Sequence, residues 1–406
     1  MKPTALYGLA LLLLTPLFAR AQEDEISLKT SGQIRGRGEV DDRDFNEDTD
    51  ASDFSMLRAR LNLKSQLSDR ISAFVQLQDS RVGGSEATTL SSSANVDLHQ
   101  GYFQIDRLFW DWLSIKQGRM ELSYGTQRLL GAVGWHNVGR AFDAQVLGFD
   151  FESLHIDLIG ATLDEKGEND EDFGGVYLSA KKSPTWLLKP QIFQLYLLSD
   201  VDNEEIGGNA VRQRGTVGFY GKWKPGKLDV EAEFAVQGGE FDESTDIAAT
   251  MLTGSVAYNF GGAKKARLAL GLDLLSGDDP ETEDYEAFHT LFATNHKFYG
   301  YMDYFINIPR DTRNLGLSDL MLKGSISPWQ KTTFKADLHV FGLAEEDPVL
   351  EASDLGAEID LTFVYKYAER VSYTAGVSVF GPGDVFEAWR GEDGSAWAYS
   401  QIVVNY

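Results

Sequence analysis

The chain has 406 residues, with 62 Asp and Glu against 37 Lys and Arg, a formal net charge of −25 and no cysteine. Nucleic acid is a polyanion, so a chain this acidic is not expected to bind it. After the N-terminus no apolar run approaches the roughly 18 residues that a transmembrane helix needs, which excludes helical membrane spans. A chain without thiols is indifferent to oxidants, so composition leaves the redox compartment open.

The N-terminus has the three parts of a secretory signal. Lys2 supplies a positive charge, residues 6–18 form a short apolar core, and 19–21 (Ala-Arg-Ala) fit a cleavage site. We predict a cleaved signal peptide over residues 1–21, although a buried core helix or a membrane anchor would have a similar apolar run. The mature chain, residues 22–406, then leaves the cytoplasm as one domain.

Residues 28–39 and 57–64 show the pattern that dominates the mature chain. Polar residues such as Arg37 and Arg58 alternate with apolar residues and glycine. Period-two alternation places one side of a strand in water and the other against an apolar environment. Further strands are expected over 71–80, 96–108, 113–131, 141–151, 154–163, 173–182, 187–199, 214–223, 227–239, 247–260, 264–276, 315–327, 331–343, 353–365, 371–381 and 396–406.

These segments make about 18 strands, and the connections between them alternate in length. Long connections, such as 164–172, 277–314 and 344–352, follow odd-numbered strands, whereas short ones follow even-numbered strands. This parity is required if both chain ends lie on the same side of one membrane. A soluble β-sandwich also alternates polar and apolar residues, but its connections need no strict parity.

The pattern therefore predicts an all-β fold, a transmembrane antiparallel β-barrel. In lipid every backbone N–H and C=O must be paired internally, so strands cross only as a closed barrel without edges. Trp110, Trp112 and Trp329 stand beside short turns, where an indole ring suits the membrane–water boundary. The last strand ends at Tyr406 and resembles the C-terminal signal of outer-membrane barrels.

Much of the acid lies in the long connections, for example in 41–53 and 278–284. Acidic loops keep a protein soluble, and clustered carboxylates also suit Ca²⁺ bridging to anionic lipopolysaccharide or to a ligand. No segment has the spacing of an EF-hand, so the sequence assigns no metal ligand and leaves a metal site unknown.

The most distinctive stretch is 117–144, QGRMELSYGTQRLLGAVGWHNVGRAFDA, an alternating strand that passes into a Gly-rich turn region. Arg119 is expected on the polar face of that strand. With 97–102 (DLHQGY) and 294–303 (TNHKFYGYMD), this stretch resembles the bacterial alginate-export porin family. The resemblance implies an outer-membrane barrel of about 18 strands whose Arg-rich constriction passes an anionic polyuronate.

A polyuronate carries one carboxylate per sugar, and the guanidinium fork of Arg pairs carboxylates bidentately without losing its charge. Rings of such charges set the selectivity of a pore. Carboxylates on the same polar faces, such as Glu121 and Asp360, are alternative salt-bridge partners for these arginines. The candidate pore-lining residues are Arg35, Arg37, Arg58, Arg60, Arg119, Arg128 and Arg140.

The longest connection, 277–314, is too long for a simple hairpin turn. Its second half, 292–305, is aromatic and sparsely acidic, which is unsuited to a surface in water. We expect this half to fold into the barrel mouth as a constriction, with His296, Lys297 and Asp303 facing the passage.

The expected function is a bacterial outer-membrane channel that exports an alginate-like polyuronate through an Arg-lined lumen, as a monomer without cofactor. Its expected partners are the anionic polysaccharide, outer-membrane lipid and lipopolysaccharide, and periplasmic export machinery. The main alternative is an uptake porin for oligouronates or other small anions, because a passive channel has no intrinsic direction. The sequence has no G-x-S-x-G, H-E-x-x-H or phosphate-loop motif, so no catalytic residue is expected. An outer-membrane enzyme using His136 or His296 and an adhesive barrel with a plugged lumen are weaker alternatives.

Overall fold

The computed structural model describes residues 26–85, 95–166, 169–183, 189–202 and 212–406. The expected signal peptide, residues 1–21, lies outside these residues. Within the described ranges, no helix has both the length and the apolar character needed to cross a membrane.

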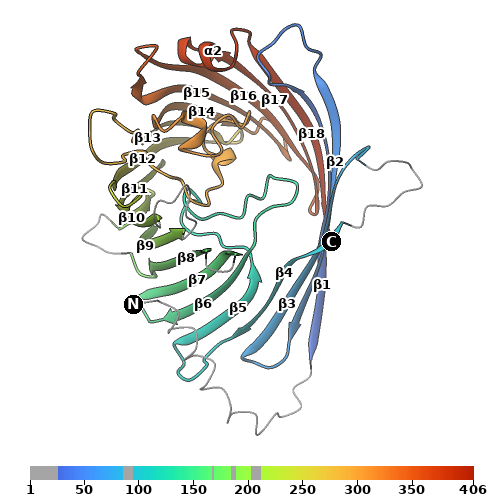
Figure 1. The fold of residues 1–406 in the computed structure, drawn as a ribbon. Helices are drawn as coiled ribbons and strands as arrows, with labels where there is room; N and C mark the ends of the chain where they lie inside the picture. Colours follow the sequence, from blue (N-terminus) through green and yellow to red (C-terminus); the bar gives the residue numbers. More distant parts are fainter. Residues whose placement is uncertain (1–25, 86–94, 167–168, 184–188, 203–211) are drawn as a thin grey trace.

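Across the described residues, 18 strands form one antiparallel sheet that closes on itself (Figure 1). The first strand, β1 (Ser27–Asp42), pairs with β2 (Ser52–Gln66) on one side and with β18 (Ser395–Asn405) on the other, which closes the barrel. The expected all-β antiparallel barrel is thus confirmed. The other strands are β3 (Ile71–Val82), β4 (Val96–Ile105), β5 (Leu113–Met120), β6 (Phe142–Asp150), β7 (Leu154–Lys166), β8 (Asn169–Ala180), β9 (Ile192–Asp202), β10 (Arg212–Trp223), β11 (Leu228–Glu240), β12 (Asp246–Gly261), β13 (Ala266–Leu275), β14 (Leu317–Ile326), β15 (Thr332–Asp347), β16 (Ala352–Ala368) and β17 (Val371–Pro382).

The two faces of the wall differ in polarity, as the period-two pattern requires. On β13, Leu270 points outward and is 59% exposed, whereas Asp273 points inward and is 1% exposed. On β1, Ile34 points outward while Arg35 and Arg37 are buried on the inner side. An outer surface of leucine, valine and isoleucine is the surface that lipid covers in a membrane barrel.

Aromatic rings gather at the end of the barrel that carries the short turns. Trp110 and Trp112 stack with ring centroids 5.0 Å apart, and Trp112 also stacks on Phe149 and Phe151. Trp329 stands at another short turn, beside Phe334. In outer-membrane barrels the short turns face the periplasm, so this ring of aromatic residues marks the periplasmic boundary of the membrane.

The expected strand 113–131 is wrong in its second half. The strand β5 ends at Met120, and residues 121–141 leave the wall and run inside the barrel. Gly118, with φ +127°, lies so close to the backbone of Gly101 that a side chain there would collide with it. Polar and apolar residues still alternate after Met120, because one side of the segment packs against the inner wall. The sequence pattern is therefore the same as that of a wall strand.

Two connections that were expected to be long are shorter than predicted. The ladder of β7 and β8 reaches Lys166 paired with Asn169, inside the expected loop 164–172. Likewise β15 continues to Asp347 and β16 begins at Ala352, inside the expected loop 344–352. Their acidic composition predicted loops, but backbone pairing above the membrane does not depend on the polarity of the side chains.

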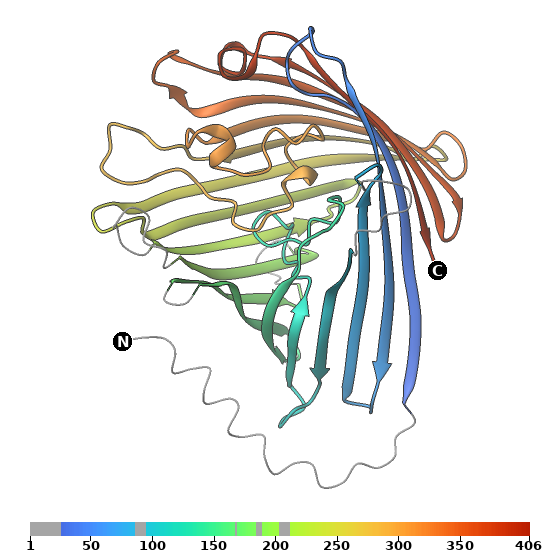
Figure 2. The same cartoon turned by 45° about the vertical axis from the view of Figure 1, so that its right-hand side comes forward.

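Residues 121–141 and 288–306 together form a plug inside the barrel. Figures 1 and 2 show them as the segment that follows β5 and the segment that precedes β14. Gly131 N–H donates to the carbonyl oxygen of Phe292 at 2.9 Å, and Phe292 N–H donates to that of Leu129 at 2.9 Å. This backbone pairing joins the two segments, so the plug behaves as one body.

Apolar packing holds the plug together and fixes it to the wall. Leu129, Leu130 and Phe288 are fully buried, and the ring of Phe292 meets that of Phe173 on β8 with centroids 5.3 Å apart. The inward course expected for 292–305 agrees with these contacts. Three short helices accompany this region: η3 (Asn295–Lys297), η4 (Arg310–Thr312) and α2 (Asp384–Arg390).

Candidate functional site in the lumen

Arg35 and Arg58 hold the Gly-rich turn of the plug against the wall. Arg35 donates to the carbonyl oxygens of Gly134 at 3.1 Å, Trp135 at 3.0 Å and His136 at 3.1 Å. Arg58 donates to those of Gly134 at 3.1 Å and His136 at 3.0 Å. The two arginines are 4% and 5% exposed. Their hydrogen-bond partners are neutral oxygens, so neither guanidinium is paired with a carboxylate where the plug covers it.

Arg37 and Arg60 are paired with carboxylates as well as with the plug. Arg37 Nε lies 2.7 Å from Glu39 Oε1, and its Nη1 donates to the carbonyl oxygen of Trp135 at 3.0 Å. Arg60 Nη1 lies 3.2 Å from Glu121 Oε1. The wall salt bridges that the sequence left open are therefore present for these two residues.

Arg128 and Arg140 belong to the plug itself. Arg128 Nη1 lies 2.6 Å from Asp273 Oδ2 on β13 and donates to the hydroxyl of Tyr299 at 3.1 Å. Burial alone would lower the pKa of Arg128, but the charges of Asp273 and other nearby groups, including Glu233, together with the hydrogen bond to Asp273 raise the pKa. Arg140 donates to the carbonyl oxygen of Ala293 at 3.1 Å, and its burial lowers its pKa. Arg128 therefore anchors the plug to the wall, and Arg140 joins the two segments of the plug.

Arg119 faces outward, contrary to the expectation that it lines the pore. It pairs with Asp143 on β6 at 2.9 Å, on the outer side of the wall. The inward side chains next to them, Met120 and Phe142, are buried under the plug. The inner face of β5 and β6 is apolar at Met120 and Phe142 because the plug, not water, covers it. The polar side chain of Arg119 therefore lies on the outer face.

His296 lies in the plug between two aromatic rings. Its Nδ1 is 2.6 Å from Asp303 Oδ1, and its ring stacks on Trp135 at 4.6 Å and on Tyr301 at 5.2 Å between centroids. This stack joins the Gly-rich turn to the second segment of the plug. Lys297, next in the chain, instead donates to the carbonyl oxygen of Thr126 at 3.0 Å.

Glu358 on β16 anchors the second segment of the plug. Its Oε1 accepts the backbone N–H of Tyr301 at 2.5 Å and that of Met302 at 3.0 Å. Gly300 lies directly over the carboxyl group, where a side chain would collide with it. The plug is thus held by guanidinium groups on β1 and β2 and by a carboxyl group on β16.

A cavity of about 270 Å³ lies on the extracellular side of the plug. Arg37, Arg43 and Arg140 line it together with the rings of Trp135 and Trp397. The guanidinium of Arg37 lies over the ring of Trp135 at 4.2 Å from its centroid. We call this space the outer cavity. Its lining combines these cations and rings with the carboxyl groups of Glu39 and Asp303.

A second cavity, of about 440 Å³, lies on the opposite side of the plug, and we call it the periplasmic cavity. Its cations are Arg128, Lys222, Arg267, Lys297 and Lys323, and its carboxyl groups are those of Glu231, Glu233 and Asp273. Burial and the nearby charge of Arg128 lower the pKa of Lys297. Lys323 was missed in the sequence, although its period-two position on the expected strand 315–327 already placed it on the polar face.

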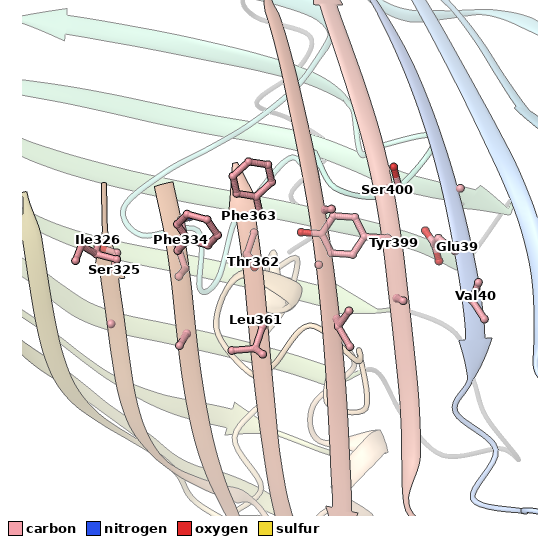
Figure 3. A pocket seen from close by; sticks show the side chains of 18 of the residues that line it. Glu39, Val40, Ser325, Ile326, Phe334, Leu361, Thr362, Phe363, Tyr399 and Ser400 are labelled. Carbon is pink, nitrogen blue, oxygen red and sulfur yellow. The ribbon is translucent and has the colours of Figure 1, made fainter. Parts of the chain in front are cut away.

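A larger groove of about 1300 Å³ lies on the membrane-facing side of the wall and does not belong to the lumen. Figure 3 shows Phe334, Leu361 and Phe363 on neighbouring strands β15 and β16 in this groove. Leu361 is 54% exposed and belongs to the outward set of side chains. Hydrocarbon covers such a surface in a membrane, so we place the functional site in the lumen.

Among the side chains that the structure describes, no three His, Asp or Glu residues are grouped as a metal ion would require.

Replacing Arg128 by glutamine is expected to destabilise the barrel by about 3 to 5 kcal/mol, because a buried ion pair loses one partner. The midpoint of urea unfolding in detergent measures the loss. Arg107→Gln is the matched control: its pair with Asp69 is exposed to water at the short turns, and such pairs contribute less than about 1 kcal/mol. Equal losses in the two variants would contradict the role of Arg128 as a buried anchor.

A closed barrel with an apolar outer wall, a polar lumen and an inward plug defines an outer-membrane channel. Residues 26–399 match the sequence profile of the alginate export family, and the chain belongs to that family. This confirms the resemblance seen in the sequence and the location in the bacterial outer membrane. A search of curated proteins gave no sequence match.

Solved porin structures share the fold at low sequence identity. OccK11 (OpdR) of Pseudomonas aeruginosa is 10% identical, with a TM-score of 0.62 over 93% of this chain and 95% of that chain. A BenF-like porin from Pseudomonas fluorescens Pf-5 is 10% identical, with a TM-score of 0.62 over 93% of this chain and 98% of that one. OpdK of Pseudomonas aeruginosa, solved with vanillate, is 11% identical, with a TM-score of 0.59 over 93% and 98%. The family and these neighbours are channel proteins rather than enzymes.

Proposed function

We propose that the protein exports an anionic polysaccharide, an alginate-like polyuronate, through its lumen as a monomer. The observation that carries this proposal is the uncompensated charge of Arg35 and Arg58. Within the described ranges, neither guanidinium has a carboxylate at ion-pair distance, and both bind only neutral oxygens. Membership of the alginate export family supports the same substrate class.

The outer cavity brings Arg37, Arg43 and Arg140 together, and a guanidinium fork can pair with the carboxylate of a sugar. Arg37 is paired with Glu39 and Arg43 with Asp41, so in this proposal the sugar carboxylates compete with these wall carboxylates for the guanidinium groups. Charges in a lumen with low-dielectric walls act strongly on a permeating ion, whereas the acidic loops are screened within about 8 Å. The channel therefore prefers anions in spite of the net charge of −25.

The plug must yield for a polymer to pass, because it separates the outer cavity from the periplasmic cavity. In this proposal, periplasmic export machinery delivers the polymer, and lipopolysaccharide surrounds the acidic extracellular loops. Uptake of oligouronates uses the same chemistry in the opposite direction. Neighbouring genes distinguish the two, since polymer-synthesis enzymes imply export and lyases imply uptake.

Current through single channels in planar bilayers tests the proposal. We expect a reversal potential that shows anion preference, and a current that falls when polyuronate is added, less so at high salt. The double variant Arg35→Gln and Arg58→Gln should lower the anion-to-cation permeability ratio several-fold. Arg119→Gln removes the same kind of charge from the outer wall and should change little. Cation preference in the unmodified channel, with no response to polyuronate, would refute the substrate assignment.

A further inference from the structure

The periplasmic cavity is built mainly from wall positions near the short turns. Lys222 is the penultimate residue of β10, and Arg267 is the second residue of β13. Lys323 on β14 precedes the turn that follows that strand, and Lys297 bounds the cavity from the plug. The cavity therefore opens toward the periplasm and is bounded by the plug on its other side.

Two of its cations lack a carboxylate partner. Lys222 is paired with Glu231, with Nζ and Oε1 2.5 Å apart. Arg267 is paired with Asp229 at 3.8 Å, and Arg128 with Asp273 at 2.6 Å. In the part of the chain that the structure describes, Lys323 makes no ion pair or hydrogen bond, and Lys297 donates only to the carbonyl oxygen of Thr126, at 3.0 Å. Both ammonium groups thus retain donors for an incoming anion.

The cavity also has space and an apolar face. On β13 it is lined by Ala269, whose side chain is a methyl group, and by Gly271, which has no side chain, and this leaves its volume open. Phe298 presents its ring from the plug, and Tyr220 does so from β10. Ammonium groups beside aromatic rings and open volume are the surroundings that bind a carboxylated sugar.

We propose that this cavity is a second anion-binding site, for the carboxylates of a uronate-type saccharide that arrives from the periplasm. Lys323 contacts the ligand from the wall and Lys297 contacts it from the plug. The site is complete only when the plug is in place, so it holds the saccharide directly against the constriction before the plug yields. The proposal rests on the substrate class proposed above and adds a lysine site distinct from the arginines of the outer cavity.

Sided block of the channel current by a short oligouronate tests the second site. Lys323→Gln and Lys297→Gln should each raise the half-blocking concentration of oligouronate added from the periplasmic side about tenfold. Each variant loses one charge-assisted hydrogen bond to the saccharide. Block from the extracellular side should stay unchanged. Lys323→Arg keeps the charge and should restore most of the periplasmic block. Lys264→Gln, on an exposed short turn outside the cavity, is the matched control and should behave as the unmodified channel.

The absence of cysteine allows a second test that needs no saccharide. A negatively charged thiol reagent should modify Lys323→Cys quickly from the periplasmic side and lower the small-anion current. From the extracellular side the plug should slow the same reaction by at least an order of magnitude. Equal rates from both sides would overturn the placement of the cavity below the plug.

The outcomes separate this site from the proposed function. Block of the unmodified channel together with unchanged periplasmic block in both lysine-to-glutamine variants would overturn the second site and leave polyuronate export standing. If the oligouronate blocked the unmodified channel only from the extracellular side, the second site would likewise be overturned and polyuronate export would stand. An unmodified channel that the oligouronate blocks from neither side would overturn both proposals.

Discussion

A chain that ends at Ser395 is expected to be missing from the outer membrane. The last strand, β18, pairs with β17 on one side and with β1 on the other, so its loss opens the barrel at both edges. Unpaired backbone groups cost several kcal/mol each in lipid, and an open edge also invites aggregation. Heat-modifiable migration of protein from isolated outer membranes measures the folded fraction, which should fall below detection.

The control for this truncation is Tyr406→Phe. The ring of Tyr406 stays in place, and only a hydroxyl that donates to the carbonyl oxygen of Arg60 at 3.3 Å is lost. This variant should assemble normally. A truncated chain that reached the outer membrane in normal yield would contradict closure through β18.

Removal of residues 288–306 should raise single-channel conductance several-fold. The deleted segment carries half of the plug, including Phe292, which pairs with the first segment, and the loop that Glu358 holds. Without it the Gly-rich turn loses its apolar partner and the lumen is left wider, and conductance grows with the open cross-section. Planar-bilayer recording measures the change.

A matched deletion isolates the effect of the plug. Residues 280–284 lie in the exposed first half of the same connection and do not reach the lumen cavities. Their removal shortens the loop but should leave conductance unchanged. If the larger deletion folded and conducted like the unmodified channel, the segment would lie outside the conducting path.

The barrel could be predicted from the sequence because its wall strands alternate between lipid-facing apolar residues and lumen-facing polar residues. Each strand places residues such as Ile34 toward lipid and residues such as Arg35 toward the lumen, and this period-two choice depends only on neighbours in the chain. Long and short connections then set the strand order. The antiparallel barrel follows from that alternation together with the parity of the connections, and the outer-membrane location follows from the barrel.

The lumen site was less accessible because its contacts join residues far apart in the chain. Arg35 binds carbonyl oxygens near residue 135, and a backbone acceptor leaves no mark on the residue type. Residues 121–124 alternate like a wall strand although they lie inside the barrel, so the inward turn after Met120 and the outward side chain of Arg119 both escaped the pattern. Only tertiary packing distinguishes such a segment from the wall.

The anchors of the plug are spread around the circumference of the barrel. Arg35 and Arg58 hold it on β1 and β2, Asp273 on β13 and Glu358 on β16, while Phe173 meets it on β8. A bilayer presses laterally on the barrel, and the closed ring of hydrogen-bonded strands resists that pressure, with contacts across the lumen adding to the resistance. The plug therefore serves as a transverse brace that keeps the cross-section round. Any movement of the plug that lets a polymer through must break some of these contacts, and the barrel wall then becomes easier to deform.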